Sequence, residues 1–280
     1  MAVACILLSA FAALVRAETC PMHSSSSSPA LLQGSMKVQA TLSVDERSKT
    51  SKKGVGLPSS TGYGATQLEA LNASWFYSWG LKPKITVPDG VEFVPIVATA
   101  KYLQWSPASG CHDILGFNEP DHSGQANISV SEALKLWPQV LAKVPTNGRI
   151  GSPATAGNPV TGSWFPEFMA ASPHVDFVAV HWYKGAKVDK FKSDIQEVID
   201  KYQKPVWVTE FAPQTIAEST ADPTKWSQAE VNEFIQEVVS WMESNSMVER
   251  YAWHDSKSGT SWLYDDAGGL SETGQVYAAS

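Results

Sequence analysis

The sequence has no apolar run long enough to cross a membrane and no excess of positive charge. Its 280 residues carry 21 lysines and arginines against 28 aspartates and glutamates, which gives a formal net charge of -7. This balance argues against a nucleic-acid or anionic-membrane partner, because phosphate backbones and acidic lipids are not attracted to such a surface. A neutral substrate agrees better with the charge.

Several catalytic motifs are also missing. The chain contains no G-x-G-x-x-G dinucleotide loop, no G-x-S-x-G nucleophile elbow and no H-E-x-x-H zinc motif. His181 and His254 stand alone in the sequence, so we expect His181 to be a hydrogen-bonding residue rather than a ligand. We therefore expect neither a metal nor another cofactor.

The N-terminal residues resemble a secretory signal. An apolar run from Ala2 to Val15 precedes an A-x-A-like site ending at Ala17, although the usual basic residue before the run is missing. We expect residues 1–17 to be removed and the mature protein to be secreted, extracellular or in the cell wall. Two N-x-S/T sequons, at Asn72 and Asn127, are compatible with a glycoprotein.

Cysteine is scarce, with three in the chain. Cys5 leaves with the predicted signal, and Cys20 and Cys111 remain. In an oxidising compartment these two can pair, or Cys111 can be an ordinary buried thiol. The sequence leaves both alternatives open.

A serine-rich segment separates the predicted signal from the rest. Residues 18–52 include an unbroken serine run at 24–28 and few large apolar groups, so they bury too little surface to offset their ordering entropy. We expect a disordered linker there, followed by one catalytic domain over residues 53–280 in a monomeric protein.

Eight short apolar runs alternate with amphipathic stretches in that domain. Helices are predicted over 129–144 and from Ser227 onward, each opened by a Ser-x-x-Glu capping box, and over Ser193–Tyr202. Strands separated by helices pair in parallel, so the pattern predicts the α/β class and a single (β/α)8 TIM barrel. The runs cover residues 55–57, 75–79, 91–97, 114–117, 150–152, 175–183, 205–211 and 249–254.

Two of the predicted strands end in a glutamate. Period-two alternation places Glu210 on the same face as Val206 and Val208, which predicts two barrel-filling valines followed by a carboxylate at the rim. Glu119 is expected to follow Leu115 and Phe117 in the same way. Active-site groups of such barrels project from the C-terminal strand ends, so the two carboxyls are expected to face each other.

A facing carboxyl pair is typical of glycoside hydrolysis. One group protonates the departing glycosidic oxygen, and the other attacks or stabilises the oxocarbenium-like centre. An apolar setting and mutual repulsion are expected to raise the pKa of one member. Eleven tryptophans point the same way, because flat rings stack on sugars, although most are expected to fill the core.

Five motifs together resemble glycoside hydrolase family 128, the secreted β-1,3-glucanases with a compact (β/α)8 core. The resemblance covers about residues 52 to 280, and the motifs occur in order with suitable spacing. They are WFYSWG at 75–80, GFNEPD at 116–121, HWY at 181–183, VTEFA at 208–212 and RYAW at 250–253.

The resemblance implies a retaining mechanism with Glu119 as acid/base and Glu210 as nucleophile. It also implies that Asn118 holds the sugar 2-hydroxyl, that Tyr183 orients Glu210, and that the cleft is lined by His181, Trp182 and Trp253. Trp79, which shares a predicted strand face with Trp75 and Tyr77, is a further candidate for sugar contact. His254 departs from the family pattern, which has an aromatic such as Phe there. The expected ligand is a β-1,3-glucan polysaccharide or oligosaccharide, cleaved within the chain, although these residues do not decide between endo and exo attack.

Two alternatives stay open. A non-catalytic β-glucan-binding cell-wall protein can use the same fold, since fold alone does not establish activity. A hydrolase of another β-glycan, such as mannan or cellulose, is a closer alternative that the motifs barely exclude.

Overall fold

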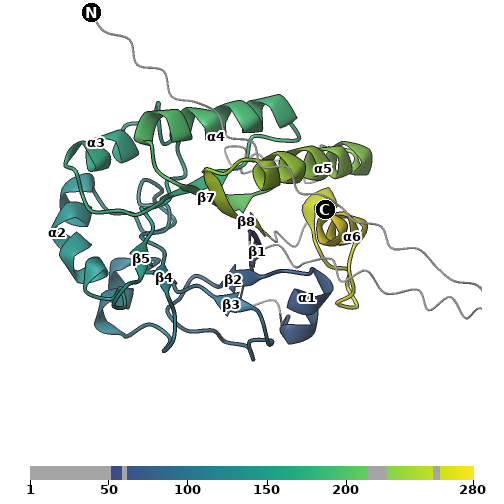
Figure 1. Ribbon diagram of the computed structural model, residues 1–280, viewed down its shortest axis with the longest axis horizontal. Helices are drawn as coiled ribbons and strands as arrows, with labels where there is room; N and C mark the ends of the chain where they lie inside the picture. Colours follow the sequence, from purple (N-terminus) through teal and green to yellow (C-terminus); the bar gives the residue numbers. More distant parts are fainter. Residues whose placement is uncertain (1–51, 59–61, 214–225, 255–258) are drawn as a thin grey trace, which may run out of the picture. The chain divides into compact units, whose positions relative to one another are not determined.

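The structure is a computed structural model that describes residues 52–58, 62–213, 226–254 and 259–280 (Figure 1). These residues belong to one compact unit, Arg47–Ser280. The predicted signal peptide and nearly all of the predicted linker lie outside the described residues. Lys52 is described, and its Nζ donates hydrogen bonds to three carbonyl oxygens at the C-terminal end of α5 (Gln228–Ser244), those of Met242, Glu243 and Asn245.

Eight parallel strands form the centre of this unit. Six of them pair in the order β3-β2-β1-β8-β7-β6, and β4 pairs with β5. The strands are β1 (Lys53–Gly56), β2 (Trp75–Tyr77), β3 (Glu92–Phe93), β4 (Asp113–Ile114), β5 (Arg149–Ile150), β6 (Val178–Trp182), β7 (Val206–Phe211) and β8 (Val248–His254).

Backbone hydrogen bonds close these strands into a ring. The Leu115 N–H donates to Pro95 O at 2.8 Å, which links the β3 and β4 segments, and the Ser152 N–H donates to Phe177 O at 3.0 Å, which links β5 to β6. The prediction of a single (β/α)8 barrel is confirmed.

Helices lie outside the strands, as Figure 1 shows for α2 to α5. A 3-10 helix stands between β3 and β4 where a full barrel helix is expected. The helices are α1 (Ala65–Ala70), η1 (Ala100–Gln104), α2 (Val130–Leu141), α3 (Trp164–Ala170), α4 (Val188–Tyr202), α5 (Gln228–Ser244), η2 (Gly259–Ser261) and α6 (Glu272–Ala279). None of the described helices is long and apolar enough to cross a membrane.

The helix starts follow the capping signals in two of three predicted cases. Ser129 accepts from the Glu132 N–H, and Ser227 and Glu230 form a reciprocal capping box. The third helix, α4, begins at Val188, five residues before the predicted start. Lys187 precedes it without a side-chain cap, so no sequence signal marked this end.

The predicted inward face of β7 is wrong. Val206 and Val208 pack in an outer cluster with helix residues such as Phe234, whereas Trp207 lies in an inner cluster of strand residues with Phe177. Strict alternation would then point Glu210 outward, toward the helices.

A β-bulge at Thr209 turns Glu210 into the barrel. Strand β6 pairs Val180 with Val208 and then His181 with Glu210, so Thr209 is one extra residue on β7. A single inserted residue reverses the side-chain alternation that follows it. Glu210 thus faces inward by a local irregularity rather than by a regular period.

The β4 segment is irregular in a similar way. Leu115 lies in the inner cluster as predicted, but Phe117 packs outward in the cluster around α2, 6.1 Å between ring centroids from Trp137. Gly116 lies against the next segment so closely that a Cβ would come within 2.8 Å of Pro153 N. Regular alternation does not extend through such a contact, so the prediction for Phe117 is wrong.

Candidate active site

Two glutamates face each other at the C-terminal end of the barrel. Glu119 follows β4 and Glu210 lies on β7, and each is 4% exposed. One oxygen of each carboxylate and one ring nitrogen of His181, on β6, lie within 4.8 Å of one another. The structure therefore brings together the residues that the sequence placed on three separate strands.

Three neutral donors surround the Glu210 carboxylate. Oε1 lies 2.9 Å from the Tyr77 hydroxyl and accepts from Trp79 Nε1 at 3.1 Å, and Oε2 accepts from the Tyr183 hydroxyl at 2.6 Å. Burial by itself raises the pKa of Glu210, but the positive charges of His181 and His254 and the two hydroxyl hydrogen bonds lower it below the ordinary value. Glu210 is therefore held ionised and oriented.

The two tyrosines keep their protons. Burial raises the pKa of Tyr77 and of Tyr183 well above the ordinary value, and the charge of Glu210 raises both further. Both hydroxyls consequently remain hydrogen-bond donors over the working range of pH. This supports the predicted orienting role of Tyr183.

His181 bridges the carboxylates. Its Nδ1 lies 3.0 Å from Glu119 Oε1 and 3.4 Å from Glu210 Oε2. Burial lowers the pKa of His181, but the charge of Glu210 and the hydrogen bond and charge of Glu119 outweigh it and raise that pKa above the ordinary value. The imidazole of His181 can therefore hold a proton between the two carboxylates.

Glu119 has a left-handed backbone, with φ of 41°. Its N–H donates to Ala154 O at 2.7 Å, which fixes the turn after β4. A non-glycine residue in this region is uncommon and costs about 1–3 kcal/mol where the surroundings enforce it. Trp79, across the site, has the same type of backbone with φ of 47°.

Asn118 and Trp79 lie beside the carboxyl pair. The Trp79 N–H also reaches Asn118 Oδ1 at 3.1 Å, so this one donor is shared between the amide and Glu210. The Asn118 Nδ2 donates to Gln125 Oε1 at 3.2 Å, which orients the amide. The role of Asn118 toward a sugar hydroxyl stays a prediction.

Of two tryptophans predicted to line the cleft, Trp253 lies away from it and Trp182 lies at its border. The Trp253 ring is fully buried in the outer layer against Phe211, and its N–H donates to Ser261 O at 2.9 Å, so it does not line the cleft. Trp182 also points outward, packs on Phe234 and donates to Asp194, although it borders the cavity beside Glu119. Both tryptophans occupy strand positions that face the helices, and the sequence pattern did not distinguish these positions from those that face the barrel interior.

Two side chains of the site were missing from the predicted set. Tyr77 lies in the WFYSWG motif at 75–80 without a predicted role, yet its hydroxyl contacts the Glu210 carboxylate. His254 packs edge-on against Trp79 and Tyr183, with ring centroids 5.5 and 5.6 Å apart, and its buried Nδ1 has no hydrogen-bond partner in the described part of the chain. The location of His254 at the end of a predicted strand was the sequence signal that could have identified it as a site residue.

The triad of Glu119, His181 and Glu210 also has the donor types of a metal site. The Glu210 oxygens, however, already face two hydroxyls and an indole N–H, which compete for the lone pairs that a cation would need. The arrangement fits carboxyl chemistry better than cation binding.

Cavities lie on both sides of the carboxyl pair. One of about 540 Å³ is bordered by Glu119, Asp121 and Asn158, and one of about 880 Å³ is bordered by Trp79, Tyr102 and Trp105. Both fall in the range of roughly 300–1,000 Å³ that ligand sites occupy. A chain-like ligand can therefore extend in two directions from the acids.

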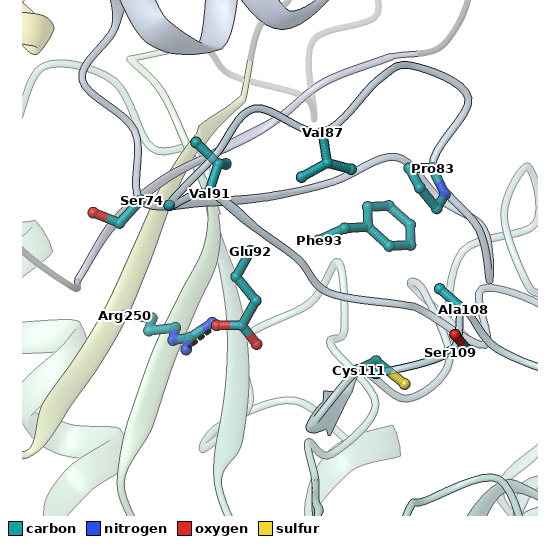
Figure 2. Close-up of a pocket in the computed structure, with 12 residues that line it drawn as sticks. Ser74, Pro83, Val87, Val91, Glu92, Phe93, Ala108, Ser109, Cys111 and Arg250 are labelled. Atoms are coloured by element: carbon teal, nitrogen blue, oxygen red, sulfur yellow. Dashed lines mark hydrogen bonds and ion pairs between the residues drawn. The ribbon is translucent and has the colours of Figure 1, made fainter.

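A third cavity, of about 660 Å³, lies at the opposite, N-terminal end of the strands (Figure 2). Figure 2 shows Arg250 paired with Glu92 and Cys111 at the border. Burial raises the pKa of the Cys111 thiol, which makes it a poor nucleophile. Cys20, with which Cys111 would pair in one of the two alternatives, lies outside the described residues.

A barrel whose fourth and seventh strand segments present facing glutamates defines the catalytic core of a glycoside hydrolase. Comparison with protein families agrees, since the family described as glycosyl hydrolase catalytic core matches residues 55–277. A comparison with curated protein sequences gave no match.

Solved structures identify the family more closely. A subgroup I endo-β-1,3-glucanase from Amycolatopsis mediterranei, in complex with laminaripentaose, is 36% identical with a TM-score of 0.72, over 82% of this chain and 99% of that chain. A subgroup II endo-β-1,3-glucanase from Sorangium cellulosum is 26% identical with a TM-score of 0.66, over 81% and 98%. A subgroup VII oligosaccharide-binding protein from Trichoderma gamsii is 26% identical with a TM-score of 0.64, over 81% and 92%.

The chain belongs to glycoside hydrolase family 128, a β-1,3-glucan hydrolase family. The predicted resemblance is confirmed. The family includes both glucanases and an oligosaccharide-binding protein, so membership alone leaves the activity of this chain to its site.

Proposed function

We propose that this protein hydrolyses β-1,3-glucan within the chain and retains the anomeric configuration. The observation that carries the proposal is the approach of Glu119 and Glu210 oxygens to within 4.8 Å. Retaining enzymes have carboxyls about 5–5.5 Å apart, whereas inverting enzymes need roughly 6.5–9.5 Å to hold a water between them. The close approach of these oxygens favours retention.

Glu210 is assigned the role of nucleophile. Its pKa is lowered and three donors fix its oxygens, so it is ionised and aimed before a substrate binds. One oxygen forms a bond to the anomeric carbon while the glycosidic carbon–oxygen bond breaks, giving a glycosyl ester.

Glu119 is assigned the role of acid/base. Its oxygen shares a 3.0 Å hydrogen bond with His181 Nδ1, and the proton of this pair is available to the departing oxygen. The departing chain leaves as an alcohol and Glu119 is left as a carboxylate. Glu119 then takes a proton from the water that hydrolyses the ester.

His181 couples the two steps. The negative charge of Glu210 contributes to the raised pKa of the ring, and that charge disappears when the ester forms. The ring then holds a proton less strongly, so it does not compete with Glu119 for the proton taken from water. His181 is in this view a positioning residue that also balances charge.

The same cavities favour attack within a glucan chain. Glu119 borders the smaller cavity, where the departing part would lie, and Trp79, which contacts Glu210, borders the larger one, where the retained part would lie. Space on both sides accommodates a chain that passes through the site.

A product analysis tests this assignment. Laminarin digested by the protein is expected to give a ladder of oligosaccharides at early times, with newly formed reducing ends that are initially β-anomers by NMR. Glucose as the sole early product would contradict endo attack, and initial α-anomers would contradict retention. Binding of laminarin with no new reducing ends would favour the non-catalytic alternative, and equal rates on mannan or cellulose would favour another β-glycan.

The pH profile tests the oriented carboxylate. Because the pKa of Glu210 is lowered, the acidic limb of kcat/KM is expected below the ordinary pKa of a glutamate, and activity is lost only as pH falls through that lowered value. Tyr183→Phe removes the 2.6 Å hydrogen bond and is expected to move the limb to higher pH and to lower kcat.

Tyr264→Phe is the matched control, since its hydroxyl donates to the Gln67 carbonyl away from the site. The acidic limb of the kcat/KM profile is expected to be unchanged in Tyr264→Phe. An unchanged limb in Tyr183→Phe would show that the tyrosine does not act on Glu210.

Export remains part of the proposal, supported by the signal-like residues 1–17 and by the polymeric substrate. Asn127, in one sequon, is exposed and accessible to glycosylation, and Asn72 is partly exposed. Mass spectrometry of the secreted protein would show both the cut and any glycans.

A further inference from the structure

Trp105 is exposed over 50% of its surface, and it is the one exposed large apolar side chain in the described ranges. It follows η1, in the loop between β3 and β4. A single exposed apolar side chain is common on protein surfaces and needs no function by itself. Two further observations give this one a role.

The backbone of Trp105 is fixed although its ring is exposed. Lys143, after α2, donates from Nζ to Trp105 O at 2.6 Å and to Leu103 O at 2.8 Å. Tyr102 packs against the indole with ring centroids 5.7 Å apart in an edge contact. The ring is therefore presented from an anchored segment and not from a free loop.

Trp79 links the cavity beside this ring to the candidate active site. Trp105 and Tyr102 border one part of the 880 Å³ cavity, and Trp79 borders another. Trp79 in turn donates its N–H to Glu210. A ligand that fills this cavity extends from Trp79, which contacts Glu210, toward Trp105.

We propose that Trp105 is a stacking platform for a glucosyl unit remote from the cleaved bond, on the side of the chain that becomes attached to Glu210, with Lys143 as its positioning residue. This inference rests on the proposed function. It assigns to the protein a preference for longer β-1,3-glucans.

The chemistry of the site suits a neutral sugar. A tryptophan ring offers a flat apolar face and an N–H, which match the C–H face and hydroxyls of a pyranose. Gln104 and Ser106 border the same cavity and supply further polar atoms. Binding energy gained at such a distance can position the chain for attack at the reacting centre.

Binding of laminari-oligosaccharides of two to six units tests the platform. The full chain carrying Glu210→Gln is titrated by calorimetry, with and without Trp105→Ala. We expect Trp105→Ala to weaken laminarihexaose binding about tenfold and to leave laminaribiose binding unchanged. The length at which the two proteins diverge gives the number of units between Glu210 and Trp105.

Two companion variants sharpen the test. Trp105→Phe keeps a smaller ring and should lose less affinity, and Lys143→Met removes the anchor and should weaken only the longer ligands, by about two- to tenfold. Glu237→Gln on α5, in a surface ion pair with Lys192, is the control with no expected change.

The outcomes separate this inference from the proposed function. Equal affinities at every length, or an equal loss for the disaccharide and the hexasaccharide, would overturn the platform while leaving the catalytic proposal standing. No binding of any oligosaccharide, or cleavage by the Glu210→Gln protein, would instead overturn the proposed function.

Discussion

Glu210→Ala is expected to lower laminarin hydrolysis by several orders of magnitude while the protein stays folded. The substitution removes the group that would form the glycosyl ester. The melting temperature is expected to fall but to stay above the assay temperature, because the two hydroxyls and the indole N–H that face Glu210 lose their buried acceptor.

Added azide distinguishes loss of the nucleophile from general damage. Azide can occupy the space left by the Glu210 side chain and attack an aryl β-laminarioside in one displacement, with the phenolate leaving and an α-glycosyl azide forming. Detection of this product by NMR supports the assignment. Near wild-type turnover of Glu210→Ala without azide would contradict the assignment of Glu210 as nucleophile.

Glu119→Ala is expected to lower laminarin hydrolysis by about 10²–10⁴-fold, the usual contribution of a general acid. The expected loss depends on the leaving group. An aryl β-laminarioside releases a phenolate that needs no proton, so formation of the ester on Glu210 should stay fast and a burst of phenolate should precede slow turnover.

Azide gives the opposite product in this variant. It intercepts the ester on Glu210 and forms a β-glycosyl azide, because two displacements restore the configuration. Steady-state and burst kinetics with both substrate types measure the effect. An equal loss on both substrates, or an α-azide, would show that Glu119 is not the acid/base.

The fold was predictable because its signals are local. Eight apolar runs and two serine caps fixed the number of strands and the start of two helices, and parallel pairing followed from the alternation. The start of α4 was missed because Lys187 provides no cap. A helix start was predictable where a serine side chain accepts a hydrogen bond from the first turn of that helix.

The sequence predicted which residues belong to the candidate site better than it predicted the directions of their side chains. Strand ends identified Glu119, Glu210, His181 and Tyr183, all of which meet in the structure. Trp253 was predicted on the wrong side of its strand, and Tyr77 was not predicted. The side of the sheet on which a side chain lies depends on how its strand pairs with neighbouring strands, and the sequence of a single strand does not contain that information. Regular alternation also fails wherever a strand carries an extra residue.

The bulge at Thr209 makes the site depend on a residue count. Val208 and Thr209 can be exchanged for similar side chains without redirecting Glu210, because the pairing on either side stays the same. Removing one residue between Val208 and Glu210 would instead restore regular alternation and carry the carboxylate to the helix side. In this strand, length is under tighter constraint than composition, so homologues should vary in the identity of this residue far more readily than in its presence.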